Sequence, residues 1–227
     1  MSKRREAYDA IRDRILRREE PFASCDDRTS ERVIAEQYVN MSRTPVREAL
    51  AVLTSTGIVK QIPQSGVEVR NLTSEEAVQA LRLRAGMESV IVEEIASQAL
   101  GGNDEMRQSL YRLETFCRDE DQVGFMLEDT SFHVGLAQLG GFHTSITSLQ
   151  GLRDRVHLFR LQQPMTESDM HAVIAEHAQL VDALASHDPV AAPDALRTHI
   201  DSTRSRIEGA HAGERVGAPE VVGVDSG

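Results

Sequence analysis

The sequence predicts a mainly α-helical protein in two parts, residues 1–70 and residues 71–209. Three observations predict it: apolar residues recur at helical spacing, aromatic residues make up only 4%, and the charge changes sign near residue 70. Residues 1–70 carry 13 Lys and Arg against 11 Asp and Glu, whereas residues 71–227 carry 12 against 25. A surface for a polyanion is therefore expected in the first part alone.

The composition also excludes several classes of protein. No apolar run approaches the ~20 residues that a membrane span requires, and the opening "MSKRREAYDA" lacks the apolar core of a signal peptide. Cys25 and Cys117 are far apart and have no nearby cysteine partner, which favours reduced thiols over a disulfide or a zinc knuckle. We therefore expect a cytoplasmic protein that makes no contact with a membrane.

The first part begins with two expected helices. Apolar residues at helical spacing between Ala7 and Leu16 predict the first helix, and those between Val33 and Tyr38 predict a second, short helix that Ser30 caps. A third helix follows in "SRTPVREAL", residues 42–50, where either Ser42 or Thr44 can be the cap. Both choices place the proline of this stretch in the first turn, where its missing N–H costs little.

The third helix has two functionally different faces. Four residues fall on its core face: Val46, Ala49, Leu50 and Leu53. Arg43, Thr44 and Arg47 share a flank beside that face. After Gly57, the segments "IVKQI" and "VEVR" flank a Pro-Gln-Ser-Gly turn and predict a two-stranded hairpin. Three helices and a hairpin in this order predict a winged helix-turn-helix.

A helix of this kind places its N-terminal residues in the major groove of DNA, where Arg can bond guanine O6 and N7. The alternative is that Arg43 and Arg47 are ordinary solvated charges, with Glu48 as a nearby partner. The small or hydrogen-bonding neighbours on the same flank, and the helix and hairpin around it, favour the DNA-binding interpretation.

The stretch "SERVIAEQYVNMSRTPVREALAVLTSTGIVKQIPQSGVEV" resembles the DNA-binding domain of GntR-type bacterial transcription regulators. The resemblance implies that four residues contact operator bases or phosphates: Arg32, Arg43, Thr44 and Arg47. It also implies that Gly66 lies at the wing tip. Asn40-Met41 stands where the family commonly has Gly-Val, and Asn can adopt the left-handed conformation that Gly supplies.

The second part is expected to be all helical. Thr73 and Glu76 have capping-box spacing at the start of its first helix, which ends at Gly101-Gly102. Further helices are predicted over residues 103–119, 121–139, 142–161, 167–186 and 190–208. The sequence after Gly209 has no sustained periodicity, so residues 210–227 are predicted to form a flexible tail.

Histidines in the helical part indicate a metal site. Asp129 and His133 are four residues apart in "EDTSFHVGL" and therefore share one helix face. His177 and His199 lie eleven residues before and after Asp188, so two antiparallel helices joined there bring both imidazoles to one level. For the other histidines (His143, His157, His171, His187 and His211) a surface or helix-end position is expected.

"DTSFH", "EHAQLVDALASHD" and "LRTHI" resemble motifs of the FCD-type ligand-binding domain, which accompanies the FadR-like branch of the GntR family. The resemblance implies that Asp129, His133, His177 and His199 hold a divalent transition metal, with Zn²⁺, Ni²⁺ and Mn²⁺ all suited to these ligands. It also places Arg84, in "RAGME", near the effector pocket.

Two classes of function follow. The first is a homodimeric transcription regulator, expected to be a repressor, that binds a palindromic DNA operator and responds to a small carboxylate bound at the metal. The second is a metal-dependent enzyme with the winged helix as a secondary module. The sequence favours the first class, because no carboxylate other than Asp129 is placed as a general base and Glu176 is expected on a different helix face from His177.

Overall fold

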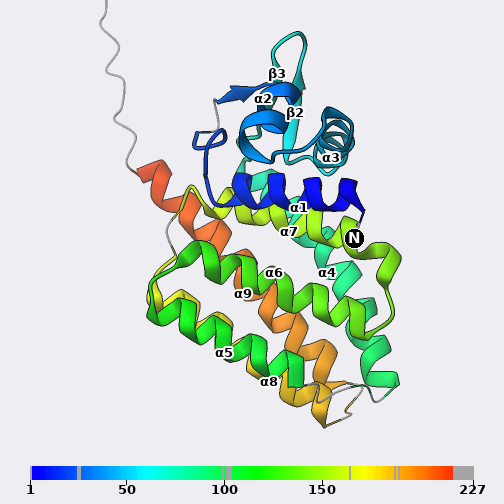
Figure 1. Ribbon diagram of the computed structural model, residues 1–227. Helices are drawn as coiled ribbons and strands as arrows, with labels where there is room; N and C mark the ends of the chain where they lie inside the picture. The colour runs from blue at the N-terminus through cyan, green and yellow to red at the C-terminus, as the bar shows by residue number, and fades with distance from the viewer. Residues whose placement is uncertain are drawn as a thin grey trace, which may run out of the picture.

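The computed structural model describes residues 2–24, 27–98, 100, 104–163, 165–186, 188 and 190–216, with residues 210–216 described by their backbone alone. A small N-terminal part with a three-stranded sheet lies on a larger part made of helices (Figure 1). The predicted fold class, a winged helix-turn-helix followed by an all-helical part, is confirmed.

The helices of the N-terminal part are α1 (Lys3–Leu16), α2 (Glu31–Val33), a π-helical turn η1 (Ile34–Tyr38) and α3 (Arg43–Ser55). The predicted cap of the second helix is confirmed, because the Ser30 hydroxyl accepts a hydrogen bond from the Val33 N–H at 3.3 Å. Asn40 has a φ of 48°, so it takes the left-handed conformation expected before α3.

Helix α3 buries the predicted core face of Val46, Ala49, Leu50 and Leu53. Ser42 is its N-cap residue, and no side-chain hydrogen bond caps this end of the helix. Because α3 packs against α1, its apolar face is covered and its N-terminal end remains on the surface.

The hairpin consists of β2 (Val59–Ile62) and β3 (Gly66–Val69), in which Ile62 pairs with Gly66 next to the turn. A short strand β1 (Arg28–Thr29) pairs antiparallel with the other edge of β3, which gives the order β1-β3-β2. The sequence predicted only the two strands of the hairpin. A two-residue strand has too little alternation to be recognised from the sequence.

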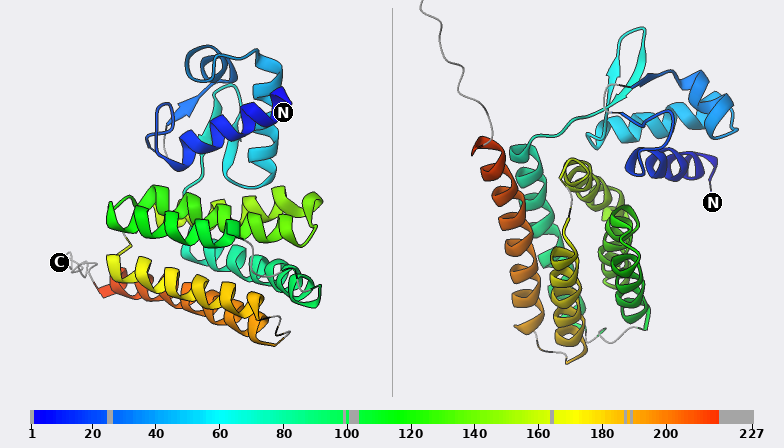
Figure 2. Two further views of the ribbon diagram at one scale, coloured as in Figure 1. Left: turned by 60° about the horizontal axis from the view of Figure 1, so that its bottom comes forward. Right: turned by 90° about the vertical axis from the view of Figure 1, so that its left-hand side faces the viewer.

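The helical part contains α4 (Ser74–Ser97), α5 (Asp104–Arg118), α6 (Gln122–Leu139), a 3₁₀ turn η2 (His143–Ser145), α7 (Ile146–Arg160), α8 (Glu167–Ala185) and α9 (Ala191–Val216). The capping box at the start of α4 is present, because the Thr73 hydroxyl accepts from the Glu76 N–H and the Glu76 carboxylate accepts from the Thr73 N–H. Figure 2 shows these helices running alongside one another beneath the N-terminal part.

Two boundaries differ from the expectations. The helix expected over 142–161 is divided into η2 and α7, and α9 continues to Val216, beyond the residue at which the tail was expected to begin. Residues 217–227 lie outside the described residues. In the part of the chain that the structure describes, no helix has the length and apolar character needed to cross a membrane.

Helix α7 is positioned between the two functional regions. It packs against α4 and α6 within the helical part and also contacts α1 of the N-terminal part. At the second contact the Arg12 guanidinium donates to the buried Asp154 carboxylate at 2.6 and 2.5 Å. One helix therefore connects the core of the helical part to the winged helix.

Candidate metal centre and DNA interface

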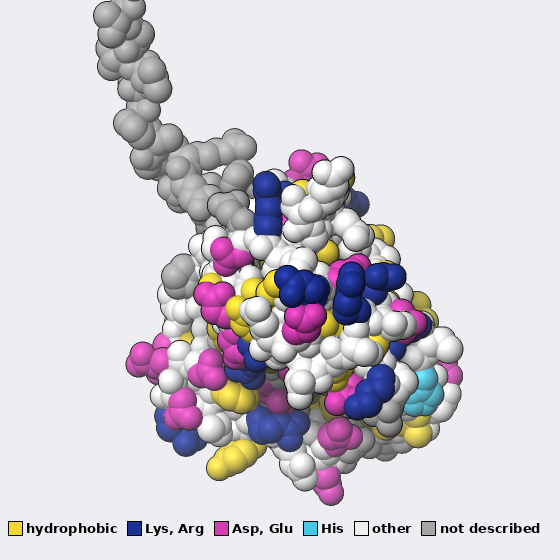
Figure 3. All heavy atoms as spheres, turned by 45° about the horizontal axis from the view of Figure 1, so that its top comes forward, with side chains coloured by type: hydrophobic (Ala, Val, Ile, Leu, Met, Phe, Trp, Pro, Cys, Tyr) yellow, Lys and Arg dark blue, Asp and Glu magenta, His cyan; other side chains and the backbone are white. Residues whose placement is uncertain are grey.

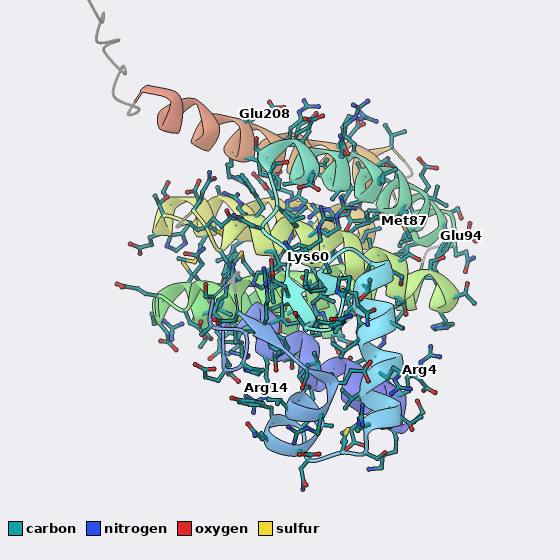
Figure 4. The ribbon with its side chains drawn as sticks, turned by 90° about the horizontal axis from the view of Figure 1, so that it is seen from above. Arg4, Arg14, Lys60, Met87, Glu94 and Glu208 are labelled. Atoms are coloured by element: carbon teal, nitrogen blue, oxygen red, sulfur yellow. The ribbon has the colours of Figure 1, made fainter. Side chains whose placement is uncertain are left out.

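The predicted DNA-contact residues lie on one end of the winged helix. Arg43, Thr44 and Arg47 are exposed in the first turns of α3, and Arg32 is exposed on α2. Figure 3 shows Lys and Arg side chains with Asp and Glu between them on the face that carries the N-terminal part. In Figure 4 Lys60 lies on β2, in the wing beside these helices.

Two of these arginines have carboxylate neighbours. The Arg47 Nε lies 3.0 Å from Glu31 Oε2, and the Arg32 Nη1 lies 3.1 Å from Glu36 Oε2. Exposed ion pairs of this kind are worth about 0–1 kcal/mol, so a DNA phosphate or guanine can replace the carboxylate. Arg43 has no carboxylate within 4.0 Å among the residues described, and its guanidinium is exposed to solvent.

The backbone conformation at Gly66 and its close contact with Thr29 both require glycine at this position. Its φ is 101°, a conformation that other residues rarely adopt, and a Cβ there would lie 2.1 Å from the Thr29 carbonyl oxygen. The residue begins β3, directly after the turn, and is flanked by the short strand β1. Its conformation therefore fixes the base of the turn from which the wing tip projects.

The structure brings the four candidate metal ligands together from three helices. Asp129 and His133 lie on α6, His177 on α8 and His199 on α9, and one ligand atom from each lies within 4.8 Å of all the others. His177 Nε2 is 3.1 Å from His133 Nε2 and 3.3 Å from Asp129 Oδ1. The expected antiparallel arrangement of α8 and α9 produces this convergence.

Three of the four candidate ligands have the protonation that metal binding requires. Burial lowers the pKa of His133 to about 4 and the pKa of His177 well below its usual value, so both imidazoles are neutral at pH 7. Burial by itself raises the pKa of Asp129, but the positive charge of Arg153 opposes burial, and the pKa is lowered. Neutral imidazoles and an ionised carboxylate can bind a cation without first losing protons.

Carboxylates outside the cluster lie against the outer nitrogens of two ligand histidines. Glu176 Oε2 lies 2.9 Å from His199 Nδ1, and Glu88 Oε1 lies 3.1 Å from His133 Nδ1. Glu88 and Glu176 are themselves held by Arg153 and Arg206. Carboxylates in this position fix the orientation and tautomer of metal-binding histidines.

Glu176 was expected on a different helix face from His177 and outside the site. It does point away from His177, its neighbour in the chain, but it reaches the next helix and contacts the ligand His199. The signal that could have found this contact was the antiparallel pairing of α8 and α9, which places a residue adjacent to one histidine opposite the other. Glu88 gave no such signal for its contact with the cluster, because His133 and Arg153, which it contacts there, lie on α6 and α7.

A narrow cavity of about 50 Å³ opens beside the cluster and is lined by Asp129, His199 and Arg84, among others. Arg84 is buried, and its Nη2 lies 3.4 Å from His199 Nε2. Burial and the neighbouring Arg153 lower the pKa of Arg84 to about 10, so it remains a cation at neutral pH. The predicted effector-pocket arginine therefore lies between the candidate metal ligands and a cavity.

The expectation for His157 was right in part. His157 lies in the last turn of α7, so the helix-end position holds, but it is 3% exposed and lines the same cavity instead of the surface. The spacing of His157 from the other histidines does not indicate its buried position. Its place one turn after Arg153, on the same helix face, could have indicated it. His143 and His171 are exposed, as expected. His187 and the side chain of His211 lie outside the described residues.

The geometry fits a metal ion better than a polar core in which the four side chains hydrogen-bond to one another. Asp129 Oδ1 and His177 Nδ1 are buried, and neither has a hydrogen-bond partner among the described residues. An orphaned carboxylate oxygen that faces neutral imidazole nitrogens is costly unless a cation completes the site. The Phe132 ring stacks on the His177 ring at a centroid distance of 4.3 Å and restrains it. The donor set of three nitrogens and one oxygen suits Zn²⁺, Ni²⁺ or Mn²⁺.

A winged helix with exposed arginines at its recognition helix defines a class of DNA-binding proteins. Comparison with known proteins agrees with this class. Residues 3–69 match the family of bacterial regulatory proteins called gntR, and residues 79–202 match the FCD domain. The chain belongs to the GntR family, in the branch that carries an FCD domain, and it is a transcription regulator.

Curated relatives have the same organisation. The chain is 30% identical to the HTH-type transcriptional repressor NanR of Enterobacter sp., over 84% of this chain and 80% of the relative. It is 26% identical to a probable D-xylose utilization operon transcriptional repressor of Paenarthrobacter nicotinovorans, over 70% of each chain. These relatives are transcription regulators by name, which excludes the enzyme alternative.

Solved structures share the fold. E. coli McbR/YncC matches with a TM-score of 0.77 at 18% identity, over 93% of this chain and 99% of that chain. A putative GntR regulator from Rhodococcus sp. RHA1 matches with a TM-score of 0.74 at 23% identity, over 92% and 99%. At these identities the likeness concerns the fold alone.

Proposed function

We propose that this regulator binds a palindromic DNA operator as a homodimer and acts as a repressor whose affinity for DNA changes when a small carboxylate binds at a metal in the helical part. The observation that carries the proposal is the convergence of Asp129, His133, His177 and His199 beside a buried cavity, in a chain that also presents an arginine-bearing recognition helix.

The DNA contacts are assigned to the exposed flank of α3 and its neighbours. Arg43, Thr44 and Arg47 would enter the major groove, Arg32 would bind a phosphate or base edge, and Gly66 would set the wing against the adjacent backbone. A dimer that reads two half-sites multiplies the discrimination of a single helix. A palindromic operator follows from that symmetry.

The effector site is assigned to the metal and the cavity. The four protein ligands would close a tetrahedral zinc site, whereas an octahedral ion would keep two positions for carboxylate oxygens. Arg84 supplies a cation that can pair with the bound carboxylate. The metal would supply Lewis acidity and positive charge, and the residues of this chain would orient the ligand and exclude water.

The test of operator reading begins with DNA fragments that the full chain selects from the source genome. Arg43→Ala and Arg47→Ala should each weaken binding to a selected fragment by about 1–3 kcal/mol, measured by fluorescence anisotropy, because a bidentate contact to guanine is lost. Arg197→Ala, which removes an exposed arginine from α9, is the matched control and should leave affinity unchanged. Unchanged affinity in both α3 variants would reject the assignment.

The same assay tests regulation. Carboxylates are added to the protein–DNA complex, and one that acts as effector should shift the DNA titration in the wild type but not in His177→Ala or His199→Ala. A carboxylate response that survives in both variants would place the effector away from the metal.

A further inference from the structure

The cavity beside the candidate metal centre extends along α7 away from the metal ligands. Asp129, His199 and Arg84 line one end, and α7 contributes Arg153, His157 and Arg160 to the wall. At about 50 Å³ the cavity has room for a few water molecules or a comparably small ligand. Arg153, His157 and Arg160 are spaced by four and then three residues, so they share one face of α7. At ~1.5 Å per residue, the wall from Arg153 to Arg160 extends over about 10 Å.

The arginines at the metal end already have carboxylate partners. Arg84 Nε lies 3.3 Å from Glu88 Oε2, and Arg153 contacts both Glu88, at 2.7 Å, and Asp129. These two cations are therefore balanced by the chain itself, and they explain why Glu88 and Asp129 can be buried as anions.

Arg160 at the other end has no such partner. It is 7% exposed, no carboxylate lies within 4.0 Å of it among the described residues, and its guanidinium makes no hydrogen bond to any of them. Asp169 faces it at longer range, but its carboxylate caps α8 at Thr166 and lies 3.6 Å from Arg206 Nε. Burial lowers the pKa of Arg160, and the longer-range attraction of Asp169 does not offset it.

His157 gives a second, independent indication of a ligand. It is 3% exposed, it lines the same cavity, and neither its Nδ1 nor its Nε2 has a hydrogen-bond partner in the described part of the chain. Buried polar atoms in proteins are nearly always satisfied, so two free ring nitrogens that border a cavity indicate a polar group that binds there.

We propose that Arg160 and His157 form a second anion-binding subsite, so that the effector carries two acidic groups, a carboxylate at the metal and Arg84 and a second carboxylate or phosphoryl group at Arg160. This inference rests on the proposed function and specifies the chemical class of its ligand. Arg160 supplies the charge, and His157 donates a hydrogen bond.

The test compares acids that differ only in the second anionic group. Succinate, 3-phosphonopropionate and butyrate are titrated into the full chain supplemented with Ni²⁺, with calorimetry as readout, and malonate and glutarate vary the length. Either dianion should bind about 10- to 100-fold more tightly than butyrate, as expected for one added charge-assisted contact. A preference between succinate and 3-phosphonopropionate identifies the second group.

Arg160→Met should remove the preference for dianions over butyrate, whereas Arg155→Met, a control on the same helix that does not line this cavity, should keep that preference. Equal affinity for butyrate and the dianions in the wild type overturns the second subsite and leaves the carboxylate-effector proposal standing. A preference that survives in Arg160→Met also overturns it. Failure of every acid to bind the wild type rejects both proposals.

Discussion

Glu176 illustrates how one residue outside the metal cluster can determine metal affinity. Its carboxylate accepts from His199 Nδ1, and Arg206 holds the carboxylate in turn at 2.6 Å. This arrangement points His199 Nε2 toward the other ligands and keeps the proton on the outer nitrogen. The orientation of the imidazole is therefore set by a residue from the neighbouring helix.

Glu176→Gln should weaken metal binding by about 10- to 100-fold, because the neutral amide no longer orients and polarises the imidazole. The measurement is competition of the protein with a chromophoric chelator for Ni²⁺ or Zn²⁺. Asp182→Asn, at a largely exposed carboxylate on the same helix, is the control and should bind as the wild type does. Wild-type affinity in Glu176→Gln would show that the carboxylate only balances the charge of Arg206.

Helix α7 presents adjacent residues to different regions of the molecule. Arg153 contacts Asp129 and Glu88 beside the metal cluster, and the next residue, Asp154, forms the buried pair with Arg12 of the winged helix. Burial lowers the pKa of Arg12, but the attraction of Asp154 outweighs burial and raises it, so the arginine is charged. A change at the metal that moves α7 would therefore act on the position of α1.

Asp154→Ala leaves the buried Arg12 without its partner and should lower the free energy of unfolding by about 3–5 kcal/mol, measured with urea. The double variant Arg12→Met, Asp154→Leu replaces both charges with apolar groups and should recover most of that loss. Asp13→Ala is the control, because its contact with Arg12 is half exposed. If the double variant is as unstable as Asp154→Ala, the loss comes from packing and not from the unpaired charge.

At the level of elements, the sequence predicted most of the fold because its helices have strong local signals. The Thr73–Glu76 capping box and the turn at Asn40 were visible in the sequence and are present in the structure. Strand β1 was missed because its formation depends on pairing with β3, a segment far along the chain. The role of Glu88 was missed for the same reason, since His133 and Arg153 come from other helices, and the position of His157 was missed because the cavity that it lines is formed by several helices.

For the whole molecule, the proposed homodimer requires a face that a second copy can cover. Leu83 is 62% and Val90 54% exposed on α4, with Met87 between them, and a Cβ added at Gly86 would have no neighbour within 4 Å. Figure 4 shows Met87 on α4 near the edge of the molecule. Leu83, Met87 and Val90 are spaced by four and three residues and form an apolar stripe beside Gly86, where no neighbouring atom limits close approach. Helix α4 of a second copy can pack on this stripe about a two-fold axis.

Leu83→Asp should convert the dimer to a monomer, because it places a charge in an apolar contact and the two-fold axis repeats that charge in the second copy. Light scattering coupled to gel filtration measures the molar mass. Tyr111→Asp changes an equally exposed residue on α5, at 65%, and should remain dimeric. A Leu83→Asp protein with the wild-type dimer mass would move the interface away from this face of α4.

Asp129, His133, His177 and His199 are proposed to bind one divalent transition metal, and elemental analysis of protein purified without a metal-affinity tag measures that metal. We expect about one Zn²⁺, Ni²⁺ or Mn²⁺ per chain in the wild type, and we expect both His177→Ala and His199→Ala to lose it. Wild-type protein that contains no metal and takes up none of the three ions when they are added would contradict this proposal.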